Sequence, residues 1–353
     1  MTSETNFLKI LSLNGGGVRG LYTITVLAEL ERVLAEKHGR DDLSISEYFD
    51  MISGASIGGV IALALADGHR ARDLEVEIKN LASKIFPQPR YFKNLIQNFK
   101  RAFGSLYNGD RLYNEIENIL GKDRKIRHLK RRVLIPTVNL TTGKPLFVKT
   151  CHNPSFNRDD AFSLSDVARA TSAAPTYFPP HYIKNVSAYF ADGGLLANNP
   201  TFVAYHEAMN YLDDEFKGLE PAQIKIMNVG TLSSEYCIDP QRIKSKIPGY
   251  FKLWKLGSAL VEVVMSSNQQ MHTFMANRAL NSSGDNIFEL DGSVPDQQAH
   301  LITLDNSSED ALNILVARGK DTATTWSGKP EFMKMFFGEV APEFIHPSDR
   351  GNK

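Results

Sequence analysis

The segment that runs from Gly54 to Gly58, Gly-Ala-Ser-Ile-Gly, places a single serine hydroxyl between two glycines. This Gly-x-Ser-x-Gly pattern is typical of a nucleophile elbow, a sharp strand-to-helix turn in which glycines avoid collisions beside the serine. The pattern therefore predicts that Ser56 is a catalytic nucleophile at the end of a strand. Simple packing of small residues between a strand and a helix is the alternative, because so short a pattern also occurs by chance.

A second glycine-rich segment, Gly-Gly-Gly-Val-Arg-Gly, ends at Gly20 and lies between an apolar run and a helical pattern. A serine nucleophile needs donors for the negative oxygen that forms during acyl transfer, and the amides of such a turn supply them. We predict that the amides of Gly15, Gly16 and Gly17 form this oxyanion hole, with Gly20 supporting the turn. Arg19 either faces an anion or braces the loop, and an ordinary solvated arginine fits its position as well.

The same glycines match the Gly-x-Gly-x-x-Gly pattern that holds the pyrophosphate of a dinucleotide cofactor. That interpretation requires an acidic residue at the end of the following strand, about 20 residues beyond the loop. Asp41 and Asp42 lie near this distance, but in a polar linker after a helix, and the second strand ends at the serine turn instead. A nucleotide-cofactor oxidoreductase is therefore the weaker interpretation of this loop.

Asp192 ends a short apolar run and is followed by Gly193 and Gly194. An aspartate in such a turn is often only a turn former. Its place along the chain, after the glycine loop and the serine turn, predicts instead that its carboxylate accepts the Ser56 proton as general base. The alternative base is a triad histidine, although none lies in a segment with the expected turn residues; those that follow Asp192 in hydrolase order include His206, His272 and His300.

The overall composition is that of a globular protein, with 353 residues, 42% of them hydrophobic. Its 40 basic residues balance its 40 acidic residues, so the net charge does not predict DNA or RNA as a partner. Two cysteines, Cys151 and Cys237, argue against a disulfide scaffold and favour a reducing cytoplasm. We expect neither a signal peptide nor a transmembrane helix, because the apolar runs are too short.

Two strand-turn-helix units are expected to position the glycine loop and the serine. Apolar runs at 7–13 and 48–53 each lead through a glycine turn into a helical pattern, at 21–36 and 60–66. This alternation predicts an α/β fold with a mainly parallel central sheet. The remaining strands are expected at 132–140, 145–150, 188–191 and 224–229, and the remaining helices at 165–171, 200–212, 256–278 and 309–322.

Taken together, the glycine loop at 15–20, the serine turn at 54–58 and Asp-Gly-Gly at 192–194 resemble the patatin-like phospholipases in order and spacing. The segment ARATSAAPTYFPP at 168–180 also resembles the one that this family carries before Asp-Gly-Gly. The resemblance covers roughly 7–212. It implies a three-layer patatin-like fold with helices on both faces of the sheet.

The resemblance also implies a chemistry. Ser56 and Asp192 would act as a dyad, without a catalytic histidine, metal or cofactor, to hydrolyse membrane phospholipid esters and release fatty acids. Asn14 departs from the aspartate that many members carry before the glycines. We expect this difference to have little effect, because backbone amides rather than this side chain would bind the oxyanion. A non-catalytic lipid-binding or storage protein with the same fold remains an alternative.

Residues 213–353 are expected to form an extension packed on the catalytic domain, 7–212. This extension and the compact size resemble a bacterial branch of the family, whose members are anti-phage effectors switched on by a cyclic dinucleotide. The resemblance implies such an activator here, and a cytoplasmic enzyme that acts peripherally on the inner membrane. A constitutive lipid acyl hydrolase is the alternative. Oligomeric state and activator pocket are left open.

Two stretches, 85–109 and 240–260, combine basic and aromatic residues, and the first contains no acidic residue. Such a composition suits a lid or an interfacial element that meets anionic headgroups. It also suits a pocket that pairs phosphates and stacks bases. Ordinary helices with buried aromatic and solvated basic side chains fit equally well.

Overall fold

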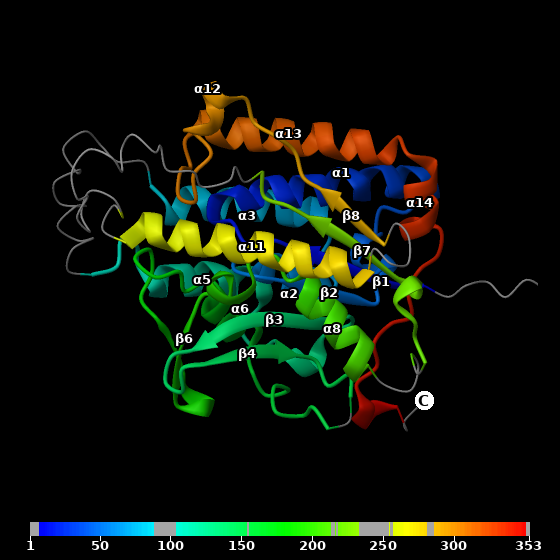
Figure 1. The fold of residues 1–353 in the computed structure, drawn as a ribbon, viewed down its shortest axis with the longest axis horizontal. Coiled ribbons are helices and arrows are strands. Elements are labelled where there is room, and N and C mark those ends of the chain that lie inside the picture. Colours follow the sequence, from blue (N-terminus) through cyan, green and yellow to red (C-terminus); the bar gives the residue numbers. More distant parts are fainter. Residues whose placement is uncertain are drawn as a thin grey trace, which may run out of the picture.

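The structure is a computed structural model, shown in Figure 1. It describes residues 7–87, 104–153, 155–212, 218–232, 257–280 and 286–350, together with Phe216 and Trp254. Most of the two basic and aromatic stretches, 85–109 and 240–260, lies outside the described residues, and so does Cys237. None of the described helices is both long and apolar enough to cross a membrane.

The described strands form one sheet in the order β5-β6-β3-β2-β1-β7-β8, and β4 pairs with β3 outside this path. Five neighbouring strands are parallel: β1 (Leu8–Leu13), β2 (Met51–Gly54), β3 (Arg132–Asn139), β7 (Ile224–Val229) and β8 (Ile287–Leu290). The antiparallel strands lie beyond β3: β4 (Lys144–Lys149), β5 (His181–Ile183) and β6 (Ala188–Ala191). The predicted mainly parallel sheet is thus confirmed.

Helices cover both faces of the sheet, because its central strands are apolar on both sides. On β1, Leu8 and Ile10 belong to one buried cluster, and Leu11 and Leu13 belong to the other. Successive strand residues face opposite sides, so a strand that is buried throughout needs a helical layer on each face. The three-layer arrangement implied by the family resemblance is confirmed.

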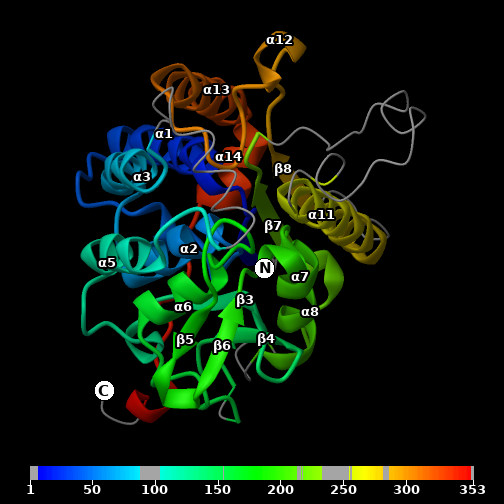
Figure 2. The ribbon, with the colours of Figure 1, turned by 90° about the vertical axis from the view of Figure 1, so that its left-hand side faces the viewer.

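Figure 2 shows the two helical layers on either side of the sheet. One layer contains α1 (Gly20–His38), α2 (Ile57–Asp67), α3 (Ala71–Ile85), α5 (Gly109–Leu120), α6 (Leu164–Thr171), α13 (Glu309–Ser327) and α14 (Pro330–Phe337). The other contains α7 (Gly194–Ala197), α8 (Thr201–Tyr211) and α11 (Ser258–Leu280). The short α12 (Asp296–Ala299) lies beyond one end of α13.

Both predicted strand-turn-helix units are present, with boundaries that differ by up to three residues, and the second helix begins at Ile57 rather than at residue 60. The second strand begins at Met51 rather than at residue 48, because a 3₁₀ helix, Ile45–Tyr48, precedes it. Ser44 caps this helix: its side chain accepts a hydrogen bond from the Ser46 amide, and its own amide donates to Glu47. A capping box of this kind competes with strand pairing at an apolar segment.

The part of the chain after residue 212 completes the central sheet rather than standing apart from it. β7 pairs in parallel with β1 along the whole length of both strands, and β8 follows on its outer side. α13 packs against α1, and α11 packs against α7 and α8. The expected extension, 213–353, therefore shares one sheet with the expected catalytic domain.

Candidate active site

Ser56 lies in a strained turn between β2 and α2. Its backbone has φ 54° and ψ −126°, values that a residue with a side chain rarely adopts. Such strain persists only where the surroundings enforce it. Here the Cβ of any other residue at Gly58 would lie 2.5 Å from the Leu13 carbonyl oxygen, and one at Gly54 would collide with the Gly58 carbonyl. These glycines let β1, β2 and α2 meet behind the serine, as predicted for a nucleophile elbow.

The Ser56 hydroxyl donates a hydrogen bond to Oδ2 of Asp192 at 2.8 Å, which brings the two predicted catalytic residues together. Oδ1 of Asp192 accepts the Gly194 amide at 2.6 Å. The Asp192 side chain is buried, and burial raises its pKa to about 7, although Ser56, Gly194 and Arg169 each act to lower it. A carboxylate that titrates near neutral pH is suited to exchange a proton with the serine.

The glycine loop between β1 and α1 lies beside this pair. The Gly15 amide donates to the Asn198 carbonyl at 2.9 Å, so it is already used within the protein. Among the described residues, no acceptor takes the amides of Gly16 or Gly17. Gly17 has φ +57°, a left-handed conformation that favours glycine, and it lines the same cavity as Ser56. The structure thus leaves two of the three predicted oxyanion donors free to bind.

Arg19 and Gly20 support this loop from its C-terminal side. The Arg19 Nε donates to the Gly16 carbonyl at 3.3 Å, which agrees with the loop-bracing role. Burial lowers the pKa of the guanidinium, whereas Glu262 and Asp291 act to raise it. A Cβ at Gly20 would meet the side chain of Ile57, the residue after the nucleophile, so this glycine lets α1 approach the elbow.

The loop that carries Asp192 is equally tight. A Cβ at Gly193 would lie 2.8 Å from Oγ1 of Thr171, and one at Gly194 would lie 2.9 Å from the Asp192 carboxylate. Thr171, at the end of α6, also accepts the Ser56 amide at 3.1 Å. Thr171 therefore joins the elbow to the aspartate loop, a role that no sequence pattern indicated.

The alternatives to the dyad receive no support from the geometry. His206 and His300 are exposed, and His272 is hydrogen-bonded to the Leu196 carbonyl. Within the described part of the chain, no histidine is hydrogen-bonded to Ser56 or Asp192. For the dinucleotide interpretation, Asp42 pairs with Arg40 in a surface turn and does not end β2, where a ribose-binding acid belongs.

An apolar cavity opens from the dyad and was not predicted from the sequence. It encloses about 680 Å³ of empty space, part of it open to solvent, and both Ser56 and Asp192 line it. Its other walls come mainly from α3 and from the segment that follows α6, and α2, α5 and α11 also contribute. The apolar lining residues include Val60, Ile78, Leu81, Ala82, Phe86, Leu112, Tyr177, Phe178, Met265 and Leu304.

The helix α11 also holds the loop after Asp192, through one polar face. Oδ1 of Asn268 accepts the Asn198 amide at 2.9 Å, and its Nδ2 donates to the Gly194 carbonyl at 2.6 Å. One and four residues further along, Gln269 and His272 make hydrogen bonds to the same segment. Sequence analysis missed these contacts, because the helix follows the aspartate by about 70 residues.

An elbow serine bonded to a buried aspartate, beside free glycine amides and an apolar cavity, defines a serine hydrolase that handles apolar acyl groups. The sequence pattern of the family described as patatin-like phospholipase matches residues 11–205. The chain belongs to this family, whose members are lipid ester hydrolases.

Three bacterial relatives are similar to nearly the whole chain, and each is named cGAMP-activated phospholipase. The protein from Vibrio cholerae is 45% identical over 344 residues, which cover 96% of this chain and 97% of that one. The Escherichia coli protein is 44% identical, with 96% and 94% covered. The Pseudomonas aeruginosa protein is 35% identical, with 96% and 94% covered.

Proposed function

We propose that the protein hydrolyses the fatty-acyl esters of membrane phospholipids through a Ser56–Asp192 dyad, and that a cyclic dinucleotide activates it. The observation that carries the catalytic part is the 2.8 Å hydrogen bond between Ser56 and Asp192 at one end of an apolar cavity. A storage or lipid-binding protein does not need a strained serine, a buried base and free amides in one place.

In the proposed reaction, Asp192 takes the proton of the Ser56 hydroxyl as Oγ attacks the ester carbonyl carbon. The amides of Gly16 and Gly17 donate to the oxyanion that forms, and losing one such donor typically raises the barrier by about 3 kcal/mol. Asp192 then passes its proton to the departing alcohol, which leaves an acyl-serine. Water, deprotonated by Asp192, attacks this ester, releases the fatty acid and restores the serine.

The lining of the cavity indicates the environment of the bound acyl chain. Its walls are aliphatic and aromatic side chains from several helices and from the segment after α6, with few polar atoms beyond the catalytic pair. An acyl chain gains free energy when it leaves water for such a surface. The glycerol and headgroup then remain toward solvent or membrane, consistent with a peripheral enzyme on the inner membrane.

The activator part rests on the relatives. Three proteins that align along almost the entire chain carry names stating that cGAMP activates them. Since the alignment includes 213–353, we infer that this chain responds to the same cyclic dinucleotide, and that it serves in antiviral defence. The sequence stretches considered for activator binding lie mostly outside the described residues.

The test is fatty-acid release from phospholipid vesicles, measured with cGAMP and with a panel of other cyclic dinucleotides. Ser56→Ala is the inactive variant, and Ser83→Ala, an exposed serine on α3, is the matched control. We expect release with cGAMP from wild type and Ser83→Ala, and none from Ser56→Ala. Release without any nucleotide would keep the hydrolase and refute activation. Equal release from Ser56→Ala would refute the dyad.

A further inference from the structure

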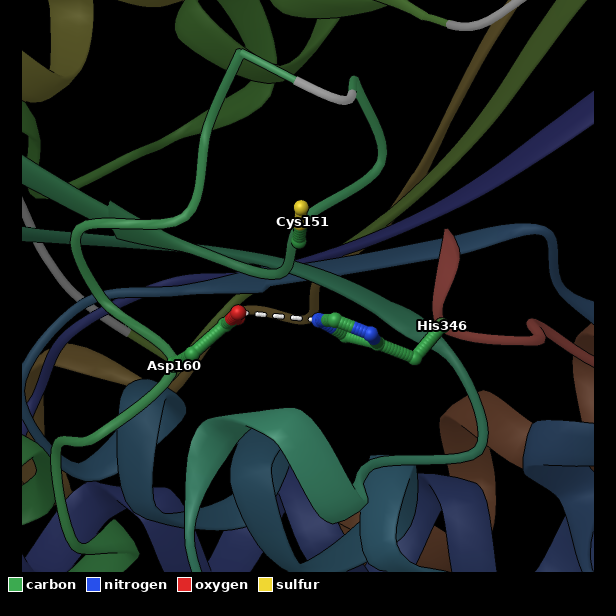
Figure 3. Close-up of side chains that lie close together, drawn as sticks. All are labelled: Cys151, Asp160 and His346. Atoms are coloured by element: carbon green, nitrogen blue, oxygen red, sulfur yellow. Dashed lines mark hydrogen bonds and ion pairs between the residues drawn. The ribbon is translucent and has the colours of Figure 1, made fainter. Parts of the chain in front are cut away.

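Three side chains with metal-binding atoms lie together far from Ser56 along the chain. Cys151 follows β4, Asp160 precedes α6, and His346 belongs to the C-terminal segment after α14. Their sulfur, oxygen and nitrogen atoms all lie within 4.8 Å of one another. Figure 3 shows the His346 ring directed at the Asp160 carboxylate, with the Cys151 thiol beside this pair.

Only one oxygen of the Asp160 carboxylate has a hydrogen-bond partner among the described residues. Its Oδ2 is hydrogen-bonded to Nε2 of His346 at 2.9 Å. Its Oδ1 is buried and accepts no hydrogen bond from the described residues. A buried carboxylate oxygen without a partner is costly, because it has lost its water and gained nothing in return. A cation beside Asp160 removes this cost.

We propose that Cys151, Asp160 and His346 bind a zinc ion. A thiolate, an imidazole and a carboxylate are the ligands that Zn²⁺ prefers, and a water molecule completes a tetrahedron. With zinc–ligand bonds of about 2.0–2.3 Å, Nε2 of His346 and Oδ2 of Asp160, now 2.9 Å apart, must separate slightly and give up their hydrogen bond, whereas the Cys151 sulfur must approach them. The thiol makes only a 3.5 Å contact with the Asn153 carbonyl, so little opposes its turning toward the pair.

The charges of this site balance. Zn²⁺ replaces the thiol proton of Cys151, which leaves as H⁺, and the thiolate and the Asp160 carboxylate together neutralise the ion. Nε2 of His346 becomes a ligand, so its ring proton moves to Nδ1. In the structure Nδ1 accepts the Ser348 amide at 3.2 Å and lies 2.8 Å from Oγ of Ser348, which donates to Asp349 at 2.9 Å. Protonation of Nδ1 therefore exchanges the contact with the amide for a hydrogen bond donated to the Ser348 hydroxyl oxygen. In zinc sites the ring N–H of a ligating histidine that does not face the metal usually donates to an acceptor, which orients the ring.

We assign this ion a structural role from its position, although structural zinc sites more commonly have four protein ligands. The C-terminal segment is also attached by the Phe344 amide, which donates to the Lys130 carbonyl, by the Arg131 guanidinium, which donates to the Ala341 carbonyl, and by the buried Phe344 ring. Zinc adds a cross-link between His346 and the loop after β4, nearly 200 residues earlier. Such a cross-link stabilises the folded state, because the unfolded chain does not hold the three ligands together.

The experiment uses the full-length protein without a histidine tag. Bound metal is counted by mass spectrometry after dialysis, and thermal unfolding is followed with added Zn²⁺ and with a chelator. Cobalt substitution reports the thiolate directly, through a near-ultraviolet charge-transfer band. The site variants are Cys151→Ser and His346→Gln, and the matched control is His300→Gln, which changes an exposed histidine.

We expect one zinc per chain in wild type and His300→Gln, a lower unfolding temperature with chelator, and no cobalt–thiolate band in Cys151→Ser. Ser348→Ala should bind zinc about 10- to 100-fold more weakly, which is the typical effect of removing the hydrogen-bond partner of a metal-ligating side chain. If dialysed wild type takes up no zinc, or if the cobalt band survives in Cys151→Ser, the site is refuted. The absorption readout keeps the test valid even where a variant is less stable.

A second inference rests on the proposed function and on α11. We propose that Asn268 is a positioning residue for Asp192. Its side-chain amide is buried and bridges two backbone groups of the loop after the base, the Gly194 carbonyl and the Asn198 amide. Gly194 donates to the Asp192 carboxylate, and the Asn198 carbonyl accepts the Gly15 amide. One side chain therefore holds the base and, through Asn198, the glycine loop.

Asn268→Leu removes both hydrogen bonds at similar volume, and Asn268→Asp keeps an acceptor for Asn198 but loses the donor to Gly194. We expect at least a tenfold lower kcat with little change in KM for the leucine variant, and a smaller loss for the aspartate variant. The control is Thr273→Val, which removes the acceptor on α11 for a hydrogen bond that Nδ2 of Asn199 donates.

Wild type and Ser56→Ala are measured in the same assay. If they are equally inactive, the proposed function fails, and no conclusion about Asn268 is needed. If wild type is active and Asn268→Leu, folded by circular dichroism, retains its kcat, the positioning role alone is refuted. A raised KM at unchanged kcat also refutes it, because that result indicates substrate binding rather than placement of the base.

Discussion

The buried carboxylate of Asp192 should make the protein less stable as the pH rises. Its pKa is about 7 in the folded protein, against an ordinary value of 3.8, because burial disfavours the charged form. Between these two pH values the unfolded chain loses this proton while the folded chain keeps it, so rising pH stabilises the unfolded state relative to the folded state. At about 1.4 kcal/mol for each pH unit, the cost reaches about 4 kcal/mol above pH 7.

The substitution Asp192→Asn removes this charge and keeps the shape. The asparagine oxygen can accept the Gly194 amide, as Oδ1 of Asp192 does, and its NH₂ group can donate to the Ser56 hydroxyl. We therefore expect the variant to be inactive, since it has no base. We also expect it to be more stable than wild type by about 2–4 kcal/mol at pH 8.5, with a difference that shrinks toward pH 4.

The assay is urea unfolding of both proteins at several pH values between about 5 and 8.5. The stability cost of Asp192 should grow up to about pH 7, its pKa in the folded protein, and level off above it. Asp321→Asn, which removes an exposed carboxylate on α13, is the control for the loss of a carboxylate outside the site. A stability gain that does not grow with pH, or a variant less stable than wild type at pH 8.5, would show that Asp192 carries no such cost. The argument for a tuned base would then be wrong.

Three further results are expected. Ser56→Ala should lose fatty-acid release while its far-ultraviolet circular dichroism stays that of wild type; residual activity near the wild-type level would require another nucleophile. His206→Ala should retain most activity, because this side chain is exposed on α8, and a collapse of activity in a folded variant would revive the triad. The kcat/KM of wild type should rise with pH through about 7, since Asp192 must lose its proton to act as base, and a flat profile would contradict this assignment.

The serine and the aspartate could be predicted because each is embedded in a local pattern. Ser56 needs glycines two residues away on either side, and Asp192 needs glycines directly after it. Each residue therefore lies in a short sequence pattern that can be recognised. Their order along the chain then indicated that they meet. The parallel sheet was also predictable, since β1 and β2 are short apolar runs that each lead into a helix through glycines.

What the sequence did not reveal depends on contacts between distant segments. No local pattern indicates that the Gly15 amide is taken by Asn198, which lies 183 positions later. The cavity was missed because its walls come from several helices, among them α3 and α5, which were not predicted at all. Their apolar residues recur at helical spacing, as in Leu74, Ile78 and Leu81, but that spacing indicates a buried face and not a substrate.

The same distant contacts bear on the proposed activation by a cyclic dinucleotide. A regulatory extension that merely blocked a complete catalytic domain would leave an active enzyme when removed. In this protein β7 pairs with β1 at the centre of the sheet, and the Val229 carbonyl at its end accepts the amide of Asn14, the residue before the glycine loop.

A chain that ends at Leu212 should therefore be insoluble or unfolded, because it exposes an edge of β1 and the apolar face beneath α13. Limited proteolysis and vesicle assays of this fragment test the point. A soluble fragment that releases fatty acids without nucleotide would show that 213–353 only inhibits. An unfolded fragment means that activation has to work by shifting the arrangement of one continuous domain, through elements such as α11 that already hold the catalytic loop.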